Sequence, residues 1–148
     1  MKAIENLIEY AEAHDVDVDF LHLNAAPAFS LQLPDGSAAI AMDPEQLETT
    51  AEERYCLAHE LGHCMTGSFY SRSAACDARG KQEANADRWA ARHLVPEAAL
   101  RRALGAGYTE RWELAELFNV PEECIELAFE LYRRDAFGRR MARLHRRW

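Results

Sequence analysis

Two histidines four residues apart, in a segment with a strong helix signal, constrain this chain more than any other feature. His59 and His63 enclose Glu60 in the pattern HExxH. At about 100° per residue, the histidines lie roughly 40° apart on one helix face, so both imidazoles can reach the same metal ion. Glu60 lies roughly 60° from His63, beside such an ion, where its carboxylate can accept a proton from metal-bound water.

The flanking residues support the helix. Thr50 and Glu53 form a capping box, which predicts a helix that runs from there to about Thr66. Gly62 costs roughly 1 kcal/mol relative to alanine inside a helix. With Ala58 it forms a strip of small residues next to the histidines, and this strip indicates close packing against another element.

A catalytic zinc site uses three protein ligands, and the next predicted helix, Lys81–Leu94, offers candidates. Glu83 and Asp87 lie four residues apart on one face of it, beside apolar positions that should point inward. Residues 67–80 are expected to form a loop that lets this helix fold back. We assign Glu83 as the third ligand and Asp87 as the acceptor for the outer nitrogen of a ligating histidine.

The remaining pattern indicates one α+β domain over residues 1–148. A short N-terminal twisted sheet is expected to pack on the HExxH helix, and the C-terminal half is expected to be helical. The predicted elements are a helix at Ala3–His14, strands at Val16–Leu21, Phe29–Leu33 and Ala38–Met42, and helices at Glu97–Leu104, Glu110–Phe118 and Glu122 to about Arg134.

The formal net charge of −8 is unevenly distributed. Residues 133–148 carry seven arginines against Asp135, a local charge of +6, so the first 132 residues hold ten basic and 24 acidic groups, or −14. An acidic body repels phosphate, so no direct nucleic-acid partner is expected. With no apolar run near the roughly 20 residues of a membrane span and no signal peptide, we expect a soluble, cytoplasmic protein.

Two segments, Tyr55–His63 and Glu83–Pro96, together resemble the ImmA/IrrE family of metallopeptidases. The first contains the family's AHELGH string and the second follows its ExxA(N/D)xFAaxLLmP pattern, in the same order and spacing. The similarity extends over roughly residues 29–130 and includes the LAxxFxV segment Leu114–Val120. Trp89 departs from this pattern, where phenylalanine is commoner, as do His93 and Cys56 at positions where leucine and threonine are frequent.

This resemblance implies a small zincin-like fold that binds Zn²⁺ through the two histidines and the downstream glutamate. It also implies hydrolysis of a peptide bond in a specific protein, with Glu60 as general base on zinc-bound water. Several members of the family cut helix-turn-helix repressors and so release genes of mobile elements or stress responses. A repressor is therefore the expected substrate.

Two other interpretations remain open. Cys56, His59, His63 and Cys76 could form a structural zinc site, although the four cysteines of the chain contain no CxxC pair and buried, idle thiols are the default. Leu114–Leu131 has the spacing of a DNA-binding helix-turn-helix, but its second helix carries four glutamates and no base before Arg133.

Two roles are left unassigned by the sequence. Tyr70, Tyr108, His93 and His22 are unranked candidates for stabilising an oxyanion. The arginine-rich C-terminus has Phe137, Met141 and Leu144 at near-helical spacing, which indicates either a final helix with a solvated basic face or a docking arm.

Overall fold

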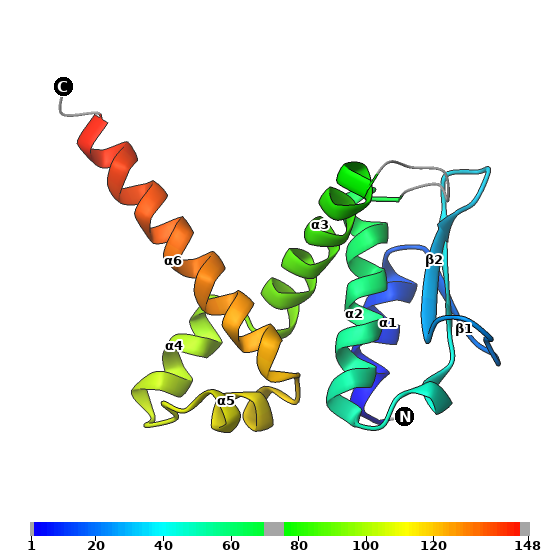
Figure 1. Cartoon of the computed structure of the whole chain (residues 1–148), viewed down its shortest axis with the longest axis horizontal. Coiled ribbons are helices and arrows are strands. Elements are labelled where there is room, and N and C mark those ends of the chain that lie inside the picture. The colour runs from blue at the N-terminus through cyan, green and yellow to red at the C-terminus, as the bar shows by residue number, and fades with distance from the viewer. Residues whose placement is uncertain (1, 70–75, 146–148) are drawn as a thin grey trace.

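The computed structural model describes residues 2–69 and 76–145 (Figure 1). Its elements are the 3-10 helices η1 (Lys2–Ile4) and η2 (Pro44–Gln46), the strands β1 (Val16–Phe20), β2 (Ala28–Gln32) and β3 (Ala38–Met42), and the helices α1 (Glu5–Ala13), α2 (Thr50–Thr66), α3 (Cys76–Leu94), α4 (Glu97–Gly105), α5 (Arg111–Phe118) and α6 (Glu122–His145). This small sheet followed by a helical half confirms the predicted α+β class.

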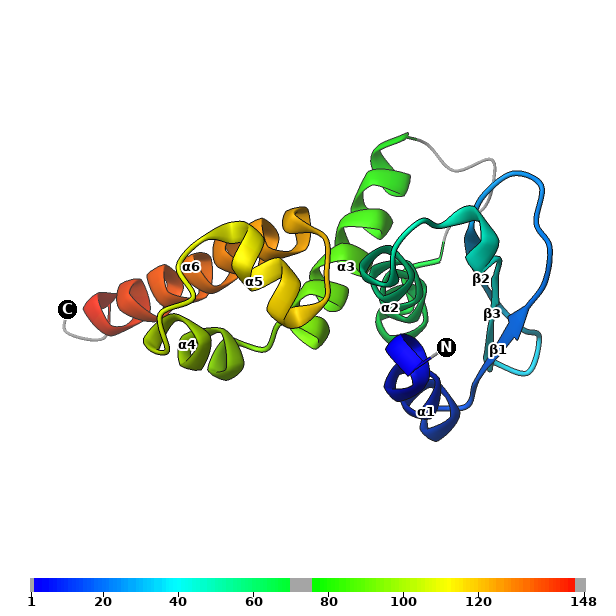
Figure 2. The same cartoon turned by 90° about the horizontal axis from the view of Figure 1, so that it is seen from below.

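The sheet has the strand order β1-β3-β2. β2 and β3 form an antiparallel hairpin, and its turn uses Gly36 at φ 91° and a hydrogen bond from the Ser37 amide to Asp35. β1 runs parallel to β3. Alternate residues of β3 are buried beneath α1 and α2, which cover the same face of the sheet (Figure 2). β2 is therefore an edge strand that lies beside α2.

The start of α2 differs by one residue from the prediction. Thr49 is the N-cap and its side chain accepts the Glu52 amide at 3.1 Å, while the Glu52 carboxylate accepts the Thr49 amide at 3.4 Å. The predicted pair, Thr50 and Glu53, has the same spacing, so the sequence contains two overlapping capping boxes. Thr50 instead donates its hydroxyl to Asn119 at 3.0 Å.

α2 and α3 approach each other very closely. A Cβ built on Gly62 would lie only 2.6 Å from the backbone oxygen of Ala86 and 2.9 Å from its Cα. Ala58 is fully buried in the same region. The close packing predicted from this strip of small residues is confirmed, and it brings the HExxH helix within side-chain reach of the helix that carries Glu83 and Asp87.

The boundaries of two helices lie outside their predicted positions. α3 begins at Cys76 rather than Lys81, so the loop predicted over 67–80 is shorter, and residues 70–75 of it lie outside the described residues. α6 continues to His145 rather than ending near Arg134. It contains no proline, and the roughly 1 kcal/mol cost of Gly138 is too small to interrupt it.

α4, α5 and α6 gather at the far end of α3 (Figure 1). Their inward side chains extend the core, and the larger ones that are almost completely buried include Leu100, Leu114, Val120, Ile125 and Leu131. The last turns of α6 project beyond this cluster (Figures 1 and 2). In the part of the chain that the structure describes, no helix is long and apolar enough to span a membrane.

Candidate metal centre

His59 and His63 on α2 converge on Glu83 of α3. The Nε2 atom of His59 lies 2.8 Å from one carboxylate oxygen of Glu83, and the Nε2 atom of His63 lies 3.1 Å from the other. The imidazole planes are nearly perpendicular, with ring centroids 4.8 Å apart. One atom from each residue thus lies within 4.8 Å of the other two, a spacing that a metal ion could bridge.

The outer nitrogen of each imidazole is held by a different partner. Nδ1 of His59 donates to Asp87 at 2.8 Å, and Nδ1 of His63 donates to the backbone carbonyl of Ser68 at 2.6 Å. The carbonyl is positioned by Gly67, which ends α2 in the left-handed conformation at φ 66°. Both contacts favour the neutral tautomer with its proton on Nδ1, which leaves Nε2 as the nitrogen available to a metal ion.

Tyr55 was not among the residues predicted to shape this site. Its hydroxyl donates to the same Asp87 oxygen as His59, at 2.7 Å. Tyr55 lies one helical turn before His59 on α2, and this spacing of four residues is the sequence signal that could have revealed it. A tyrosine, a carboxylate and a histidine therefore form one hydrogen-bonded chain from α2 to α3 and back.

The charges around His59 are strongly coupled. Burial disfavours its protonated form, but the hydrogen bond to Asp87 and the charges of Asp87, Glu60 and Glu83 together raise the pKa of His59 above its ordinary value. Burial acts on Asp87 in the opposite direction, yet hydrogen bonds from His59 and Tyr55 lower the pKa of this carboxyl. Asp87 is thus held as an anion facing His59.

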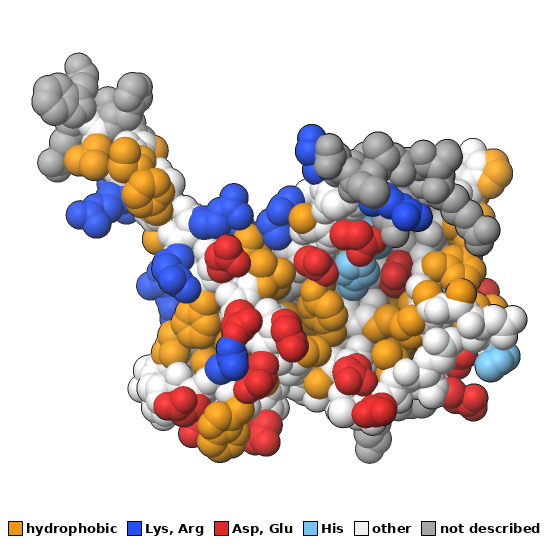
Figure 3. Space-filling model, in the orientation of Figure 1, with side chains coloured by type: hydrophobic (Ala, Val, Ile, Leu, Met, Phe, Trp, Pro, Cys, Tyr) orange, Lys and Arg blue, Asp and Glu red, His pale blue; other side chains and the backbone are white. Residues whose placement is uncertain are grey.

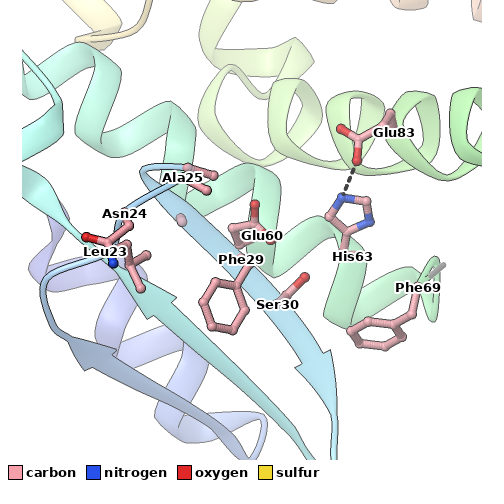
Figure 4. A pocket seen from close by; sticks show the side chains of 11 residues that line it. Leu23, Asn24, Ala25, Phe29, Ser30, Glu60, His63, Phe69 and Glu83 are labelled. Atoms are coloured by element: carbon pink, nitrogen blue, oxygen red, sulfur yellow. Dashed lines mark hydrogen bonds and ion pairs between the residues drawn. The ribbon is translucent and has the colours of Figure 1, made fainter. Parts of the chain in front are cut away.

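An apolar pocket of about 550 Å³ opens beside these residues (Figure 4). Glu60 and His63 lie on its α2 side, Glu83 on its α3 side, and Phe29 and Ser30 of β2 opposite them. Phe69 lies at the His63 end and Leu23 at the other (Figure 4). His63 is only 5% exposed. The side chain of Glu83 is 40% exposed, so the group is buried on one side and open to the pocket on the other.

The four oxyanion candidates fall in other places. His22 lies 3.3 Å from Asp43. His93 stacks on Trp89 with centroids 4.7 Å apart and contacts the Tyr10 ring edge-on. Tyr108 is 40% exposed, and none of these three lines the pocket. Tyr70 lies outside the described residues.

A second group of possible ligands consists of His22, Asp43 and Glu45. The Asp43 carboxylate already accepts hydrogen bonds from the Leu23 amide at 2.9 Å and from Gln46 at 3.1 Å. These bonds lower the pKa of Asp43 below its ordinary value. The side chain of His22 is 78% exposed.

The structure gives little support to the cysteine site. Among the described side chains, the two groups able to hold a metal contain no cysteine. Burial and the charge of Glu60 raise the pKa of the Cys56 thiol to about 12, which disfavours the thiolate that zinc requires. The side chain of Cys76 is outside the described part of the structure.

The segment with helix-turn-helix spacing forms α5 and the first half of α6. Its apolar residues, such as Leu114 and Ile125, belong to the core. The first half of α6 exposes its glutamates to solvent, namely Glu122, Glu123, Glu126 and Glu130. Such an acidic surface is poorly suited to a DNA groove.

The architecture and this group of side chains define the class of protein to which the chain belongs. A small α+β zincin-like domain places an HExxH helix against a second helix that carries a carboxylate. Over residues 11–130 the chain matches the Peptidase_M78 family, described as the IrrE N-terminal-like domain. The chain belongs to this family of metallopeptidases, and the resemblance to the ImmA/IrrE family is confirmed. Comparison with curated proteins and with solved structures finds no match.

Proposed function

We propose that this protein is a zinc-dependent endopeptidase in which His59, His63 and Glu83 bind the metal and Glu60 is the general base. The observation that carries the proposal is the convergence of both Nε2 atoms on the Glu83 carboxylate, at 2.8 and 3.1 Å, beside a pocket that Glu60 also lines. Family membership supports metallopeptidase activity, and we assign the roles of the individual residues from this geometry.

The donor set fits Zn²⁺. Two imidazole nitrogens and one carboxylate oxygen are typical of catalytic zinc sites, which keep a further position open for water or substrate. The hydrogen bonds from His59 to Asp87 and from His63 to the Ser68 carbonyl support both imidazoles from behind. When bound, zinc acidifies water and polarises the scissile carbonyl. Localisation in the cytoplasm is part of the same proposal.

Glu60 is placed to move the proton. It follows His59 directly on α2 and lines the pocket from that helix. Among the described residues, no hydrogen bond or ion pair engages the Glu60 carboxylate, so its oxygens are available. Glu60 takes the proton of the attacking water and delivers it to the nitrogen of the leaving amine, which leaves as a neutral group.

The polypeptide substrate is proposed to bind in extended form along β2. This strand is at the edge of the sheet and lies next to α2, so its outer backbone groups can pair with an added strand. An extended chain there passes Phe29 and Ser30 and reaches the pocket at Glu60. The pocket, lined by Phe29, Phe69 and alanines, favours an apolar side chain next to the cleaved bond.

We propose a helix-turn-helix repressor as the substrate. This part rests on the resemblance to repressor-cleaving members of the family and on charge. The first 132 residues carry −14, which attracts the basic surface of a DNA-binding protein rather than DNA itself. No direct contact with nucleic acid or membrane is needed for this activity.

The test compares zinc-loaded wild type with Glu60→Gln. Both are incubated with a helix-turn-helix protein encoded beside this gene and with a library of unfolded peptides, and fragments are identified by mass spectrometry. Wild type is expected to cleave, and Glu60→Gln is expected to lose at least about 100-fold in rate while keeping its zinc. The matched control is Glu116→Gln, an exposed glutamate on α5, which should cleave like wild type. Cleavage by both Glu60→Gln and wild type, or by neither, contradicts the proposal.

A further inference from the structure

The two halves of α6 carry opposite charges. Residues 122–130 contain four glutamates and no basic residue, whereas residues 133–145 contain five arginines and only Asp135 as an acid. The helix is continuous across this boundary. Figure 3 shows acidic side chains over its first half and α5, and apolar and basic side chains on the part that projects.

One face of α6 carries glutamates in its first half and apolar side chains in its second half. At about 100° per residue, Glu126 and Glu130 of the first half share an arc of roughly 60° with Phe137, Met141 and Leu144 of the second. The three apolar side chains are 65%, 48% and 44% exposed. Exposed apolar residues in one row on a projecting helix are unusual for a surface that only meets water.

Arginines border this apolar row on both flanks. Arg140 lies on the flank nearer Glu126, and Arg134 lies on the flank nearer Glu130, by the same angular count. Among the described residues, no ion pair engages Arg134, Arg140 or Glu130, whereas Glu126 pairs with Arg111.

Other contacts fix the opposite side of α6 within its own chain. Asp135 binds Arg92 of α3 at 2.8 Å, and Arg139 lies 3.8 Å from Glu97 of α4. These ion pairs hold the helix against the body. They leave the face with Phe137 directed away from it.

We propose that a second copy of this chain docks on this face, with the two α6 helices antiparallel. A two-fold axis near Tyr132 and Arg133 places Arg140 of each copy opposite Glu126 of the other. In an antiparallel pair the same flanks meet, so Arg134 of each copy comes near Glu130 of the other. The apolar row of each copy then covers the stems of these glutamates, and the contact is reciprocal, as a two-fold dimer requires.

Charge favours a second copy over other occupants. A membrane of anionic lipids or a nucleic acid would meet the arginines but also the −14 of the rest of the chain, which repels both. Pairing of the two apolar rows with each other would bring the arginines of both copies together. Only the antiparallel arrangement joins the basic half of one helix to the acidic half of another.

Sedimentation velocity over a range of protein concentrations at low ionic strength tests the proposal. We expect a reversible dimer that weakens as salt is added. Phe137→Ser and Arg134→Glu should each raise the dissociation constant by about tenfold, because each change acts twice in a symmetric dimer. Combining Arg134→Glu with Glu130→Arg restores the opposite charges across the axis and should recover most of the affinity.

Arg102→Glu is the matched control, because it makes the same charge change at an exposed position of α4. It should leave the dimer intact, and circular dichroism should show the same helix content for every variant. A monomer at all concentrations overturns the proposal. So does a dimer that Arg134→Glu strengthens, which is the result expected if the apolar rows pair with each other, or one that Arg102→Glu weakens equally.

Discussion

Among the described residues, two groups of histidine and carboxylate side chains lie close enough together to bind a metal: His59, His63 and Glu83 between α2 and α3, and His22, Asp43 and Glu45 in the segments that follow β1 and β3. In the first group the histidines are largely buried. In the second, His22 extends into solvent with its side chain 78% exposed. Similar residue types thus occur in two very different surroundings.

The partners of the carboxylates explain the difference. Both oxygens of Glu83 face imidazole nitrogens, and each imidazole is held from behind by Asp87 or the Ser68 carbonyl. The oxygen of Asp43 nearest His22 instead accepts backbone and side-chain hydrogen bonds that fasten a loop. Proximity of ligand types therefore does not distinguish the two groups, whereas the supports behind them do. A metal centre also needs ligand atoms left free by supports that engage the other side of each group.

Replacing one histidine in each group should give the largest difference in zinc affinity between the two groups. His63→Ala is expected to weaken zinc binding at least about 100-fold, since each ligand of a zinc site contributes a few kcal/mol. His22→Ala should leave the affinity unchanged within a factor of about two. Competition with a chromophoric chelator measures both. A loss of affinity in His22→Ala as large as that in His63→Ala would contradict the assignment of the metal to His59, His63 and Glu83 alone.

The contact that holds α2 against α3 can be broken without touching a ligand. In Gly62→Ala, the new Cβ would meet the Ala86 backbone oxygen at 2.6 Å, so the helices must separate. We expect the free energy of unfolding of the metal-free protein to fall by about 1–3 kcal/mol, and zinc affinity to fall with it.

Gly80→Ala is the control for this change. Gly80 lies in α3, and a Cβ at that position would meet no atom within 4 Å apart from its chain neighbours and the backbone of its own helix, so alanine should be neutral or stabilising by up to about 1 kcal/mol. Urea denaturation measures both variants. If Gly62→Ala were as stable as Gly80→Ala, the close approach of α2 to α3 would be wrong.

Weakening the hydrogen bonds that support His59 should lower zinc affinity in a graded way. Asp87→Asn is expected to lower zinc affinity about 10- to 100-fold. Tyr55→Phe, which removes only the hydroxyl 2.7 Å from Asp87, should lower it a few-fold and change its dependence on pH. The control is Tyr132→Phe, which removes a hydroxyl on α6 that donates to the Val95 carbonyl at 2.6 Å and takes no part in the support of His59. That control should lower stability alone, so a matching loss of zinc affinity would exclude a positioning role for Tyr55.

The smallest expected effect is on the pH dependence of stability, through Asp43 in the group formed by His22, Asp43 and Glu45. Hydrogen bonds from the Leu23 amide and from Gln46 lower the pKa of Asp43 in the folded state, so this group stabilises the fold above its unfolded pKa near 4. That stabilisation is lost as pH falls through the lower folded value. Melting temperatures between pH 6 and 2.5 should therefore drop more steeply for wild type than for Asp43→Asn. Parallel curves would show that the ionised form of Asp43 contributes nothing.

The helical part of the site was predictable because its signals are local. His59, Glu60 and His63 share one helix, and Glu83 and Asp87 share the next, so the spacing along each helix sufficed to select them. Gly62 indicated where the helices meet. The position of Tyr55, four residues before His59, also places it on this helix face. A single tyrosine on a helix face can serve many other roles, so the spacing alone does not select it.

Other features depend on tertiary structure that no local pattern carries. The carbonyl that orients His63 belongs to Ser68, and any residue type supplies a carbonyl. The pocket depends on β2 lying beside α2, which brings Phe29 to Glu60. The cap of α2 lies one residue before its predicted position because two boxes overlap. α6 runs past its predicted end because the helical spacing of Phe137, Met141 and Leu144 does not show whether they continue α6 or form a separate element.

X-ray absorption spectroscopy at the zinc edge of the loaded protein identifies the ligand atoms and their distances. We expect two imidazole nitrogens at about 2.0–2.1 Å, with oxygen as the remaining scatterers and no sulfur. This spectrum should be retained in His22→Ala and altered in Glu83→Ala. A sulfur shell at about 2.3 Å, or a spectrum that Glu83→Ala leaves unchanged, would contradict the assignment of His59, His63 and Glu83 as the ligands.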